Sequence, residues 1–348
     1  MKRLYSLDYL RGLAAFSIML YHYFSWTYGN FSVDGFWGRI GVYGVSIFYV
    51  LSGLTLQLVY SSKMEINKKS ILEFFRKRFF RIFPLLWLAT LTTVLLRREG
   101  YTFITLFLNF TGLFGLLKWD GYLATGAWSI GNELVFYLFF PLFIFTFKRS
   151  KTAFLFLSLI ILGIYLYFAF FLLEPNTALS IQWKNYINPL NQVFLFFGGF
   201  IIGALLKEVY VRPSVNLIIL AIAIFAFSFY PIEGNAIHIV TGWKRIFFTL
   251  CCFLICLCFY KLHYHLPKFI DKPLAILGEA SYSVYLLHPI VFSLVQAFQK
   301  RVTNYFYDFP VVFWLIAAVI STLTLGYFVY DKFEKYFMQL SRRIAVRI

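Results

Sequence analysis

Residues 7–24, LDYLRGLAAFSIMLYHYF, have the pattern of a membrane-spanning helix that an aspartate, an arginine and a histidine interrupt. Arg11 and His22 are eleven residues apart, so they fall within about 20° on one helix face and roughly 16 Å apart along the axis. Asp8 is the surface neighbour of Arg11. Because ionisable side chains are costly at bilayer depth, this polar stripe indicates a functional site or pathway. The alternative is a structural Asp8–Arg11 salt bridge with a histidine satisfied by a carbonyl.

Composition places most of the chain in lipid. Of its 348 residues, 61% are hydrophobic, 22% aromatic and only 14% charged, and the mean hydropathy is +0.74. These values lie outside the range of soluble globular domains. No short signal peptide with a cleavage site opens the sequence, so the first apolar stretch is expected to be retained. The composition predicts an all-α, polytopic integral membrane protein.

The apolar windows between charged segments predict about ten spans, since about 20 helical residues cross ~30 Å of hydrocarbon. They are residues 8–28, 39–60, 79–97, 132–147, 152–173, 187–206, 214–230, 238–260, 273–298 and 310–330. Ten spans put both termini on one side, and the bias of Lys and Arg toward that side predicts that it is the cytoplasm. An eleventh span at 101–117 would reverse this bias for the later loops, so that stretch is predicted to be re-entrant or interfacial.

The remaining composition has simple explanations. The net charge of +17 follows from the basic cytoplasmic loops, which attract anionic lipid headgroups, so no nucleic-acid partner is expected. Cys251, Cys252, Cys256 and Cys258 share one apolar helix without converging polar partners, which predicts packing and no metal site. No linker divides the chain, so residues 1–348 are expected to form a single membrane domain.

Two later spans carry further polar groups. Ser281, Tyr285 and His288 fall at i, i+4 and i+7, which lines one helix face and indicates a cavity wall, although such hydroxyls often only bond to their own helix. Glu133 is predicted near the outer end of the fourth span. It is a candidate general base, a candidate partner that orients an imidazole, or a charge that meets the helix dipole.

A basic aromatic segment precedes Pro84. Arg76, Lys77, Arg78 and Arg81 alternate with phenylalanines there, a pattern typical of lipid-headgroup binding and snorkelling. Arg78 and Arg81 also share a helix face and are able to clamp phosphates in bidentate geometry. The pattern therefore leaves two ligands open: lipid headgroups, or a phosphate-bearing molecule from the cytosol.

Taken together, these motifs resemble the acyltransferase-3 family of polytopic membrane enzymes, which carry acyl groups, usually acetyl, onto surface carbohydrates. Each motif alone is weakly specific, but they occur in family order between residues 7 and 290. The matching segments are Arg11-x10-His22, FYVLSG at 48–53, the R-x-x-R pair Arg78 and Arg81 before Phe83 and Pro84, WSIGNELVFY at 128–137, and SYSVYLLH at 281–288.

The resemblance implies acetyl-CoA as the acyl donor, no permanently bound cofactor, and a hydroxyl of a cell-surface or lipid-linked carbohydrate as the acceptor, at the cell membrane. His22 would act as a general base or would itself be acylated, and the sequence leaves both open. The implied roles are catalytic for His22 and Glu133, donor binding for Arg11, Ser52, Gly53, Arg78 and Arg81, and acceptor or oxyanion contacts for Trp128, Ser281, Tyr285 and His288.

A transporter with a buried His, Arg and Glu relay is the alternative from another class. The lack of a second R-x10-H or of paired broken helices in the other half argues against it. The basic tail at 332–347 favours a stand-alone member that modifies exopolysaccharide, capsule or O-antigen units. Peptidoglycan or a small hydroxylated metabolite as the acceptor, and a longer acyl donor such as succinyl, stay open. His238, His263 and His265 are expected to be solvated loop residues.

Overall fold

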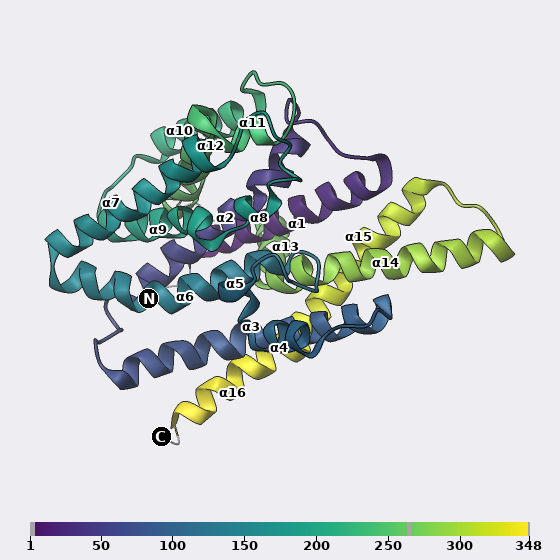
Figure 1. Ribbon diagram of the computed structural model, residues 1–348, viewed down its shortest axis with the longest axis horizontal. Helices are drawn as coiled ribbons and strands as arrows, with labels where there is room; N and C mark the ends of the chain where they lie inside the picture. The colour runs from purple at the N-terminus through teal and green to yellow at the C-terminus, as the bar shows by residue number, and fades with distance from the viewer. Residues whose placement is uncertain (1–3, 263–265, 347–348) are drawn as a thin grey trace.

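The computed structural model describes residues 4–262 and 266–346, and within those ranges it contains helices and no strand (Figure 1). Long helices packed side by side form the bundle, and short helices cap their connections. The elements are α1 (Tyr5–Tyr28), α2 (Phe36–Tyr60), α3 (Lys68–Arg97), α4 (Phe103–Thr111), α5 (Phe114–Leu117), α6 (Ala127–Arg149), α7 (Lys151–Tyr167), η1 (Phe168–Leu172), α8 (Trp183–Tyr186), α9 (Pro189–Leu205), α10 (Pro213–Phe229), α11 (Ile237–Val240), α12 (Gly242–Tyr260), α13 (Lys268–Glu279), α14 (Ser281–Tyr305), α15 (Val311–Val329), η2 (Tyr330–Glu334) and α16 (Lys335–Val346).

The membrane character of the fold is confirmed. Among the described residues, eight helical segments are long and apolar enough to cross a bilayer. They are α2, α3, α6, α7 with η1, α8 with α9, α12, α14, and α15 continuing into α16. The predicted spans at 8–28 and 214–230 are also helical, as α1 and the 17-residue α10, but do not belong to these eight. The count of ten therefore stays a prediction.

The two ends of the bundle are distinct in Figure 1. The α2–α3 and α6–α7 connections lie at the left end, where α16 also finishes, and the α14–α15 connection lies at the right end. The stretch 101–117 forms the short helices α4 and α5, separated by a turn at Gly112 with φ 73°, so it is not one continuous span. Which end faces the cytoplasm stays a prediction from the basic loops.

The prediction of one helix over 273–298 is wrong. The chain ends α13 at Glu279 and begins α14 at Ser281. Apolar composition runs through this junction, so the sequence pattern conceals the break. A close tertiary contact lies beside the break: a Cβ on Gly278 would lie 2.2 Å from the carbonyl oxygen of Asp8. The last turn of α13 is therefore packed backbone to backbone on α1.

A second close contact joins α2 to α9. A Cβ on Gly53 would lie 1.8 Å from the carbonyl oxygen of Phe196, and one on Gly199 would lie 1.9 Å from that of Val50. Small residues at such crossings let membrane helices approach and gain van der Waals contact. This crossing fixes α2 in the middle of the bundle and with it the position of Ser52.

Arg39 shows how the fold accommodates a buried cation. Its guanidinium is 1% exposed and donates hydrogen bonds to the carbonyls of Val33, Asp34, Phe227 and Tyr230. These bonds tie the start of α2 to the end of α10. Its Cζ also lies 5.5 Å from the ring centroid of Phe248, so backbone carbonyls and an aromatic ring together make Arg39 a structural residue.

We expect Gly53→Ala to lower the Tm of the detergent-solubilised protein, because the added methyl group must displace the backbone of α9. Overpacking of this kind costs about 1–3 kcal/mol. Gly163→Ala in α7 is the matched control, since no described atom lies within 4 Å of a Cβ there. A Tm for Gly53→Ala equal to that of the control would contradict the close crossing.

Candidate active site

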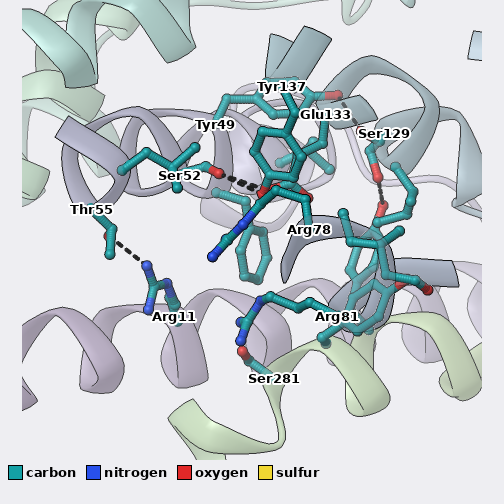
Figure 2. Close-up of a pocket in the computed structure, with 17 residues that line it drawn as sticks. Arg11, Tyr49, Ser52, Thr55, Arg78, Arg81, Ser129, Glu133, Tyr137 and Ser281 are labelled. Atoms are coloured by element: carbon teal, nitrogen blue, oxygen red, sulfur yellow. Dashed lines mark hydrogen bonds between the residues drawn. The ribbon is translucent and has the colours of Figure 1, made fainter. Parts of the chain in front are cut away.

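A cavity of about 200 Å³ lies where α1, α2, α3, α6 and α14 meet (Figure 2). Its wall contains arginines, hydroxyl groups and one carboxylate beside apolar side chains. The sequence-predicted residues that line it are Arg11, Ser52, Arg78, Arg81, Glu133, Ser281 and Tyr285. The structure thus brings together polar groups from both ends of the sequence at one place inside the bundle.

Arg78 is held among aromatic rings. Its Cζ lies 5.9 Å from the ring centroids of Tyr60 and Phe74 and 5.7 Å from that of Tyr137. The negative faces of these rings attract the cation. Its Nε is buried without a hydrogen-bond partner among the described residues. These rings therefore position the cation.

Arg11 and Arg81 complete a cationic wall. Arg11 forms an ion pair with Asp8 at 3.2 Å and donates to the Thr55 hydroxyl. The predicted Asp8–Arg11 salt bridge is therefore present, and Arg11 also lines the cavity. Arg81 lies 3.7 Å from the sulfur of Met338, a weak acceptor. Within the described ranges, neither Arg78 nor Arg81 forms an ion pair with a carboxylate. The buried Glu334 acts on Arg81 electrostatically from a longer distance.

Glu133 is bonded to hydroxyl groups of the cavity wall (Figure 2). One carboxylate oxygen accepts from Ser52 Oγ at 2.6 Å and from the phenol of Tyr137, and the two hydroxyl oxygens are 3.1 Å apart. These partners differ from His22, the imidazole it was suggested to orient. The helix dipole acts most strongly in the first turn of a helix. Because α6 begins at Ala127, Glu133 lies beyond that turn.

His22 and His288 form a hydrogen-bonded pair. His22 Nδ1 lies 2.8 Å from His288 Nε2, and the two rings are nearly parallel, with 9° between their planes and centroids 5.0 Å apart. The indole of Trp26 stacks on His22 at 4.9 Å with a 6° angle between planes. His288 is fully buried, whereas His22 is partly exposed. The predicted polar faces of the first helix and of α14 therefore meet at this pair.

The carbonyl of Tyr285 sets the direction of these hydrogen bonds. His288 Nδ1 lies 2.6 Å from that oxygen, and a carbonyl can only accept, so Nδ1 carries the proton. In a neutral His288 the Nε2 atom is then an acceptor, and His22 must donate to it through Nδ1. A neutral His22 consequently keeps the lone pair on its Nε2.

Tyr285 connects the cavity to the imidazole pair. Its ring lines the cavity and lies 6.0 Å from that of His288 between centroids. Its hydroxyl is bonded to Ser129 Oγ at 2.8 Å and donates to the carbonyl of Gly126 at 3.1 Å. His22 and His288 themselves are not among the residues that line the cavity, so Tyr285 forms the shared wall.

Some predicted residues lie elsewhere. Gly53 faces Phe196 at the α2–α9 crossing, and Trp128 packs edge-on against Trp183 with centroids 5.5 Å apart. Neither lines the cavity. The four cysteines are buried, and no group of three or more potential ligands able to hold a metal occurs among the described residues. His263 and His265 lie outside the described residues.

The sequence interpretation missed Tyr137 and Glu334. Tyr137 follows Glu133 at i+4, a spacing that places the two side chains together on a helix. Glu334 was included in the basic tail, but the last predicted span continues through η2 into α16, where this carboxylate is 4% exposed and accepts a hydrogen bond from Ser283. Its π-helical turn packs against α3, the helix that carries Arg81.

Comparison with known proteins identifies the family. The acyltransferase-3 family model, described as an acyltransferase domain, matches residues 4–331. The chain belongs to this acyltransferase family. Similar proteins include O-acetyltransferase OatA from Staphylococcus aureus strains NCTC 8325 / PS 47, COL and MRSA252, each 26% identical over 350 residues that cover 90% of this chain and 55% of the relative.

The acyltransferase spans about half the length of these curated relatives. No solved structure matches it significantly. Family membership and the apolar helices together place the chain among multi-pass membrane proteins of the acyltransferase-3 family.

We expect Thr55→Cys to react with a water-soluble thiol reagent, because Thr55 lines the cavity and is partly exposed. Thr90→Cys is the control, since Thr90 is fully buried, and the native cysteines are at most 4% exposed. Labelling is measured by mass spectrometry of the purified acyltransferase. Equal labelling of the two variants would show that the cavity does not admit water-soluble molecules.

Proposed function

We propose that this acyltransferase is an O-acetyltransferase that moves an acetyl group from acetyl-CoA to a hydroxyl of a cell-surface or lipid-linked carbohydrate. The observation that carries the proposal is the cationic cavity beside a hydrogen-bonded histidine pair. Relatives named as O-acetyltransferases support the acetyl group and the hydroxyl acceptor. A multi-pass protein of this kind would act in the cell membrane, with both termini in the cytoplasm.

The donor is proposed to bind with its phosphates at the arginines of the cavity. Arg78 and Arg81 have no carboxylate partner among the described residues, and hydrogen bonds from charged groups to phosphate are the stronger kind. Arg11 would add a third cation. The pantetheine arm would then extend along Ser52 and Tyr137 toward Tyr285. This arrangement suits a polyanion with a long neutral arm, which is the shape of a coenzyme A thioester.

His22 is the proposed catalytic residue. Its Nε2 lone pair would take the proton of the acceptor hydroxyl as that oxygen attacks the thioester carbonyl. The C–S bond then breaks, and the leaving thiolate takes up the proton to give the CoA thiol. In the second route Nε2 attacks the carbonyl itself, the C–S bond breaks and the CoA thiolate leaves. The acceptor hydroxyl then attacks the acetyl-imidazole, the N–C bond breaks to free His22, and the hydroxyl proton passes to the thiolate. Both routes use the same lone pair.

His288 is proposed to position His22. It accepts from His22 Nδ1 and is itself held by the carbonyl of Tyr285, which is the orienting role that a carboxylate has in a catalytic triad. Glu133 would act on the donor side, where it orders the hydroxyls of Ser52 and Tyr137. Ser281 and the Tyr285 hydroxyl are the proposed contacts for the acceptor or for the developing oxyanion.

The acceptor is proposed to approach from the end of α1 opposite to Arg11. Trp26, which stacks on His22, is 39% exposed there, and indole faces commonly pack on apolar and sugar-ring surfaces. Arg11 lies about three turns from His22 along the same helix, toward its other end. Donor and acceptor would thus enter from opposite sides of the bilayer and meet at Tyr285 and His22.

The function is tested by mass spectrometry of surface glycans from cells with and without the gene. We expect the deletion strain to lose the mass of an acetyl group from one glycan, and wild-type protein but not His22→Ala to restore it. General base catalysis contributes about 10²–10⁴-fold to rate. Restoration by His22→Ala would overturn the role of His22. Purified protein that transports a solute but releases no thiol from acetyl-CoA would favour a transporter.

We expect Arg81→Gln to raise the KM for acetyl-CoA by about 10- to 100-fold with little change in kcat, because a hydrogen bond to a charged group contributes about 1.5–3 kcal/mol. Arg97→Gln, at the exposed end of the same helix and outside this cavity, is the control. Thiol release from the purified protein measures both constants. An unchanged KM in Arg81→Gln would place the donor phosphates elsewhere.

A further inference from the structure

A second cavity, here called the lateral groove, runs along α3 between α4–α5 and α6. Its volume is about 490 Å³, within the range of ligand pockets. Apolar side chains dominate its wall, and two arginines line it as well. The lining residues used below are Arg76, Arg78, Phe79, Phe83, Leu116, Tyr137 and Leu138.

The lateral groove opens on the outer surface of the bundle. Phe79, Leu116 and Leu138 are 38%, 44% and 51% exposed, and they belong to α3, α5 and α6. Both α3 and α6 are long and apolar enough to span a membrane, so these exposed side chains lie where hydrocarbon chains surround the protein. The occupant of the apolar part is therefore expected to be a hydrocarbon chain.

A cation stands beside this apolar wall. Arg76 lines the lateral groove but not the cationic cavity, and its Nε is buried without a hydrogen-bond partner among the described residues. Its neighbour Lys77 forms an ion pair with Glu73 at 2.5 Å, and the same carboxylate acts electrostatically on Arg76. A guanidinium next to an apolar surface is complementary to a phosphate attached to a hydrocarbon chain.

The lateral groove and the cationic cavity share part of their walls. Arg78 and Tyr137 line both. A molecule in the groove would therefore contact the outer side of these two residues while a donor contacts their inner side. Its presence would restrict Arg78, whose Nε has no hydrogen-bond partner of its own in the described structure.

We propose that the lateral groove binds one anionic phospholipid of the surrounding bilayer, with its phosphate at Arg76 and one acyl chain along Phe79, Phe83 and Leu116, and that this lipid holds Arg78 toward the cationic cavity. The arginines of the basic segment then have two uses. Arg78 and Arg81 bind the donor in the cationic cavity, and Arg76 binds the lipid phosphate. The effect of the lipid on donor binding rests on the proposed function, whereas lipid binding itself does not.

Lipid binding is tested with the purified full chain in nanodiscs of phosphatidylglycerol and phosphatidylcholine. We expect native mass spectrometry after mild delipidation to show about one retained phosphatidylglycerol per chain, and at least fivefold less on Arg76→Gln. Lys69→Gln, an exposed residue of α3, removes the same charge and should behave as wild type. A photoactivatable phosphatidylglycerol should cross-link to α3, α5 and α6.

Equal retention by Arg76→Gln and wild type, or cross-links spread evenly around the bundle, would overturn the site. Displacement of phosphatidylglycerol by palmitoyl-CoA would also overturn it, because the groove would then hold the chain of a long acyl donor. These readouts require no enzymatic activity, so they stand or fall separately from the proposed acetyl transfer.

The coupling to the donor is tested by thiol release from acetyl-CoA. In wild type we expect the KM to rise several-fold when phosphatidylglycerol is replaced by phosphatidylcholine, and in Arg76→Gln we expect the raised KM in both lipids. A KM that is independent of lipid in wild type, with retention intact, would overturn the coupling. Absence of thiol release in every lipid would instead contradict the proposed function.

Discussion

The cost of placing positive charge within a bilayer organises this structure. Each arginine at membrane depth must be compensated by partners inside the protein, and the chain does so in different ways. Arg39 is surrounded by backbone carbonyls, Arg11 pairs with Asp8, and Arg78 rests among aromatic rings. Arg39 is thereby a structural element. Arg78 and Arg81 line a cavity and form no ion pair with a carboxylate among the described residues, so an anionic substrate bound there would add to their compensation.

Close helix packing is what lets those charges converge. The backbone contacts of Gly53 on α9 and of Gly278 on α1 bring helices nearer than side chains would otherwise allow, since membrane helices associate through such contacts. The result is a polar interior built from separate parts of the chain. His22 and His288 are 266 residues apart and share one hydrogen bond. Tyr285 contacts His288 and also lines the cationic cavity.

Most of the candidate site was accessible from spacing in the sequence. The eleven-residue step from Arg11 to His22 and the i, i+4, i+7 pattern at Ser281, Tyr285 and His288 each reflect one helix face. These patterns do not say which face meets which, so the hydrogen bonds of Glu133 to hydroxyl groups were not foreseen. The buried Glu334 was also missed, because charged neighbours gave its segment the composition of a solvated tail.

By itself, the sequence determined that the protein is helical, lies in a membrane and belongs to an acyltransferase family, since apolar composition and short ordered motifs are local properties. It also determined which polar side chains cost free energy at membrane depth and are therefore expected to have a structural or functional role. Only the tertiary structure decided that His288 is the partner of His22, that Gly53 serves packing, and that α13 and α14 are separate helices. Those outcomes depend on contacts between distant helices, whose free energy no local pattern records.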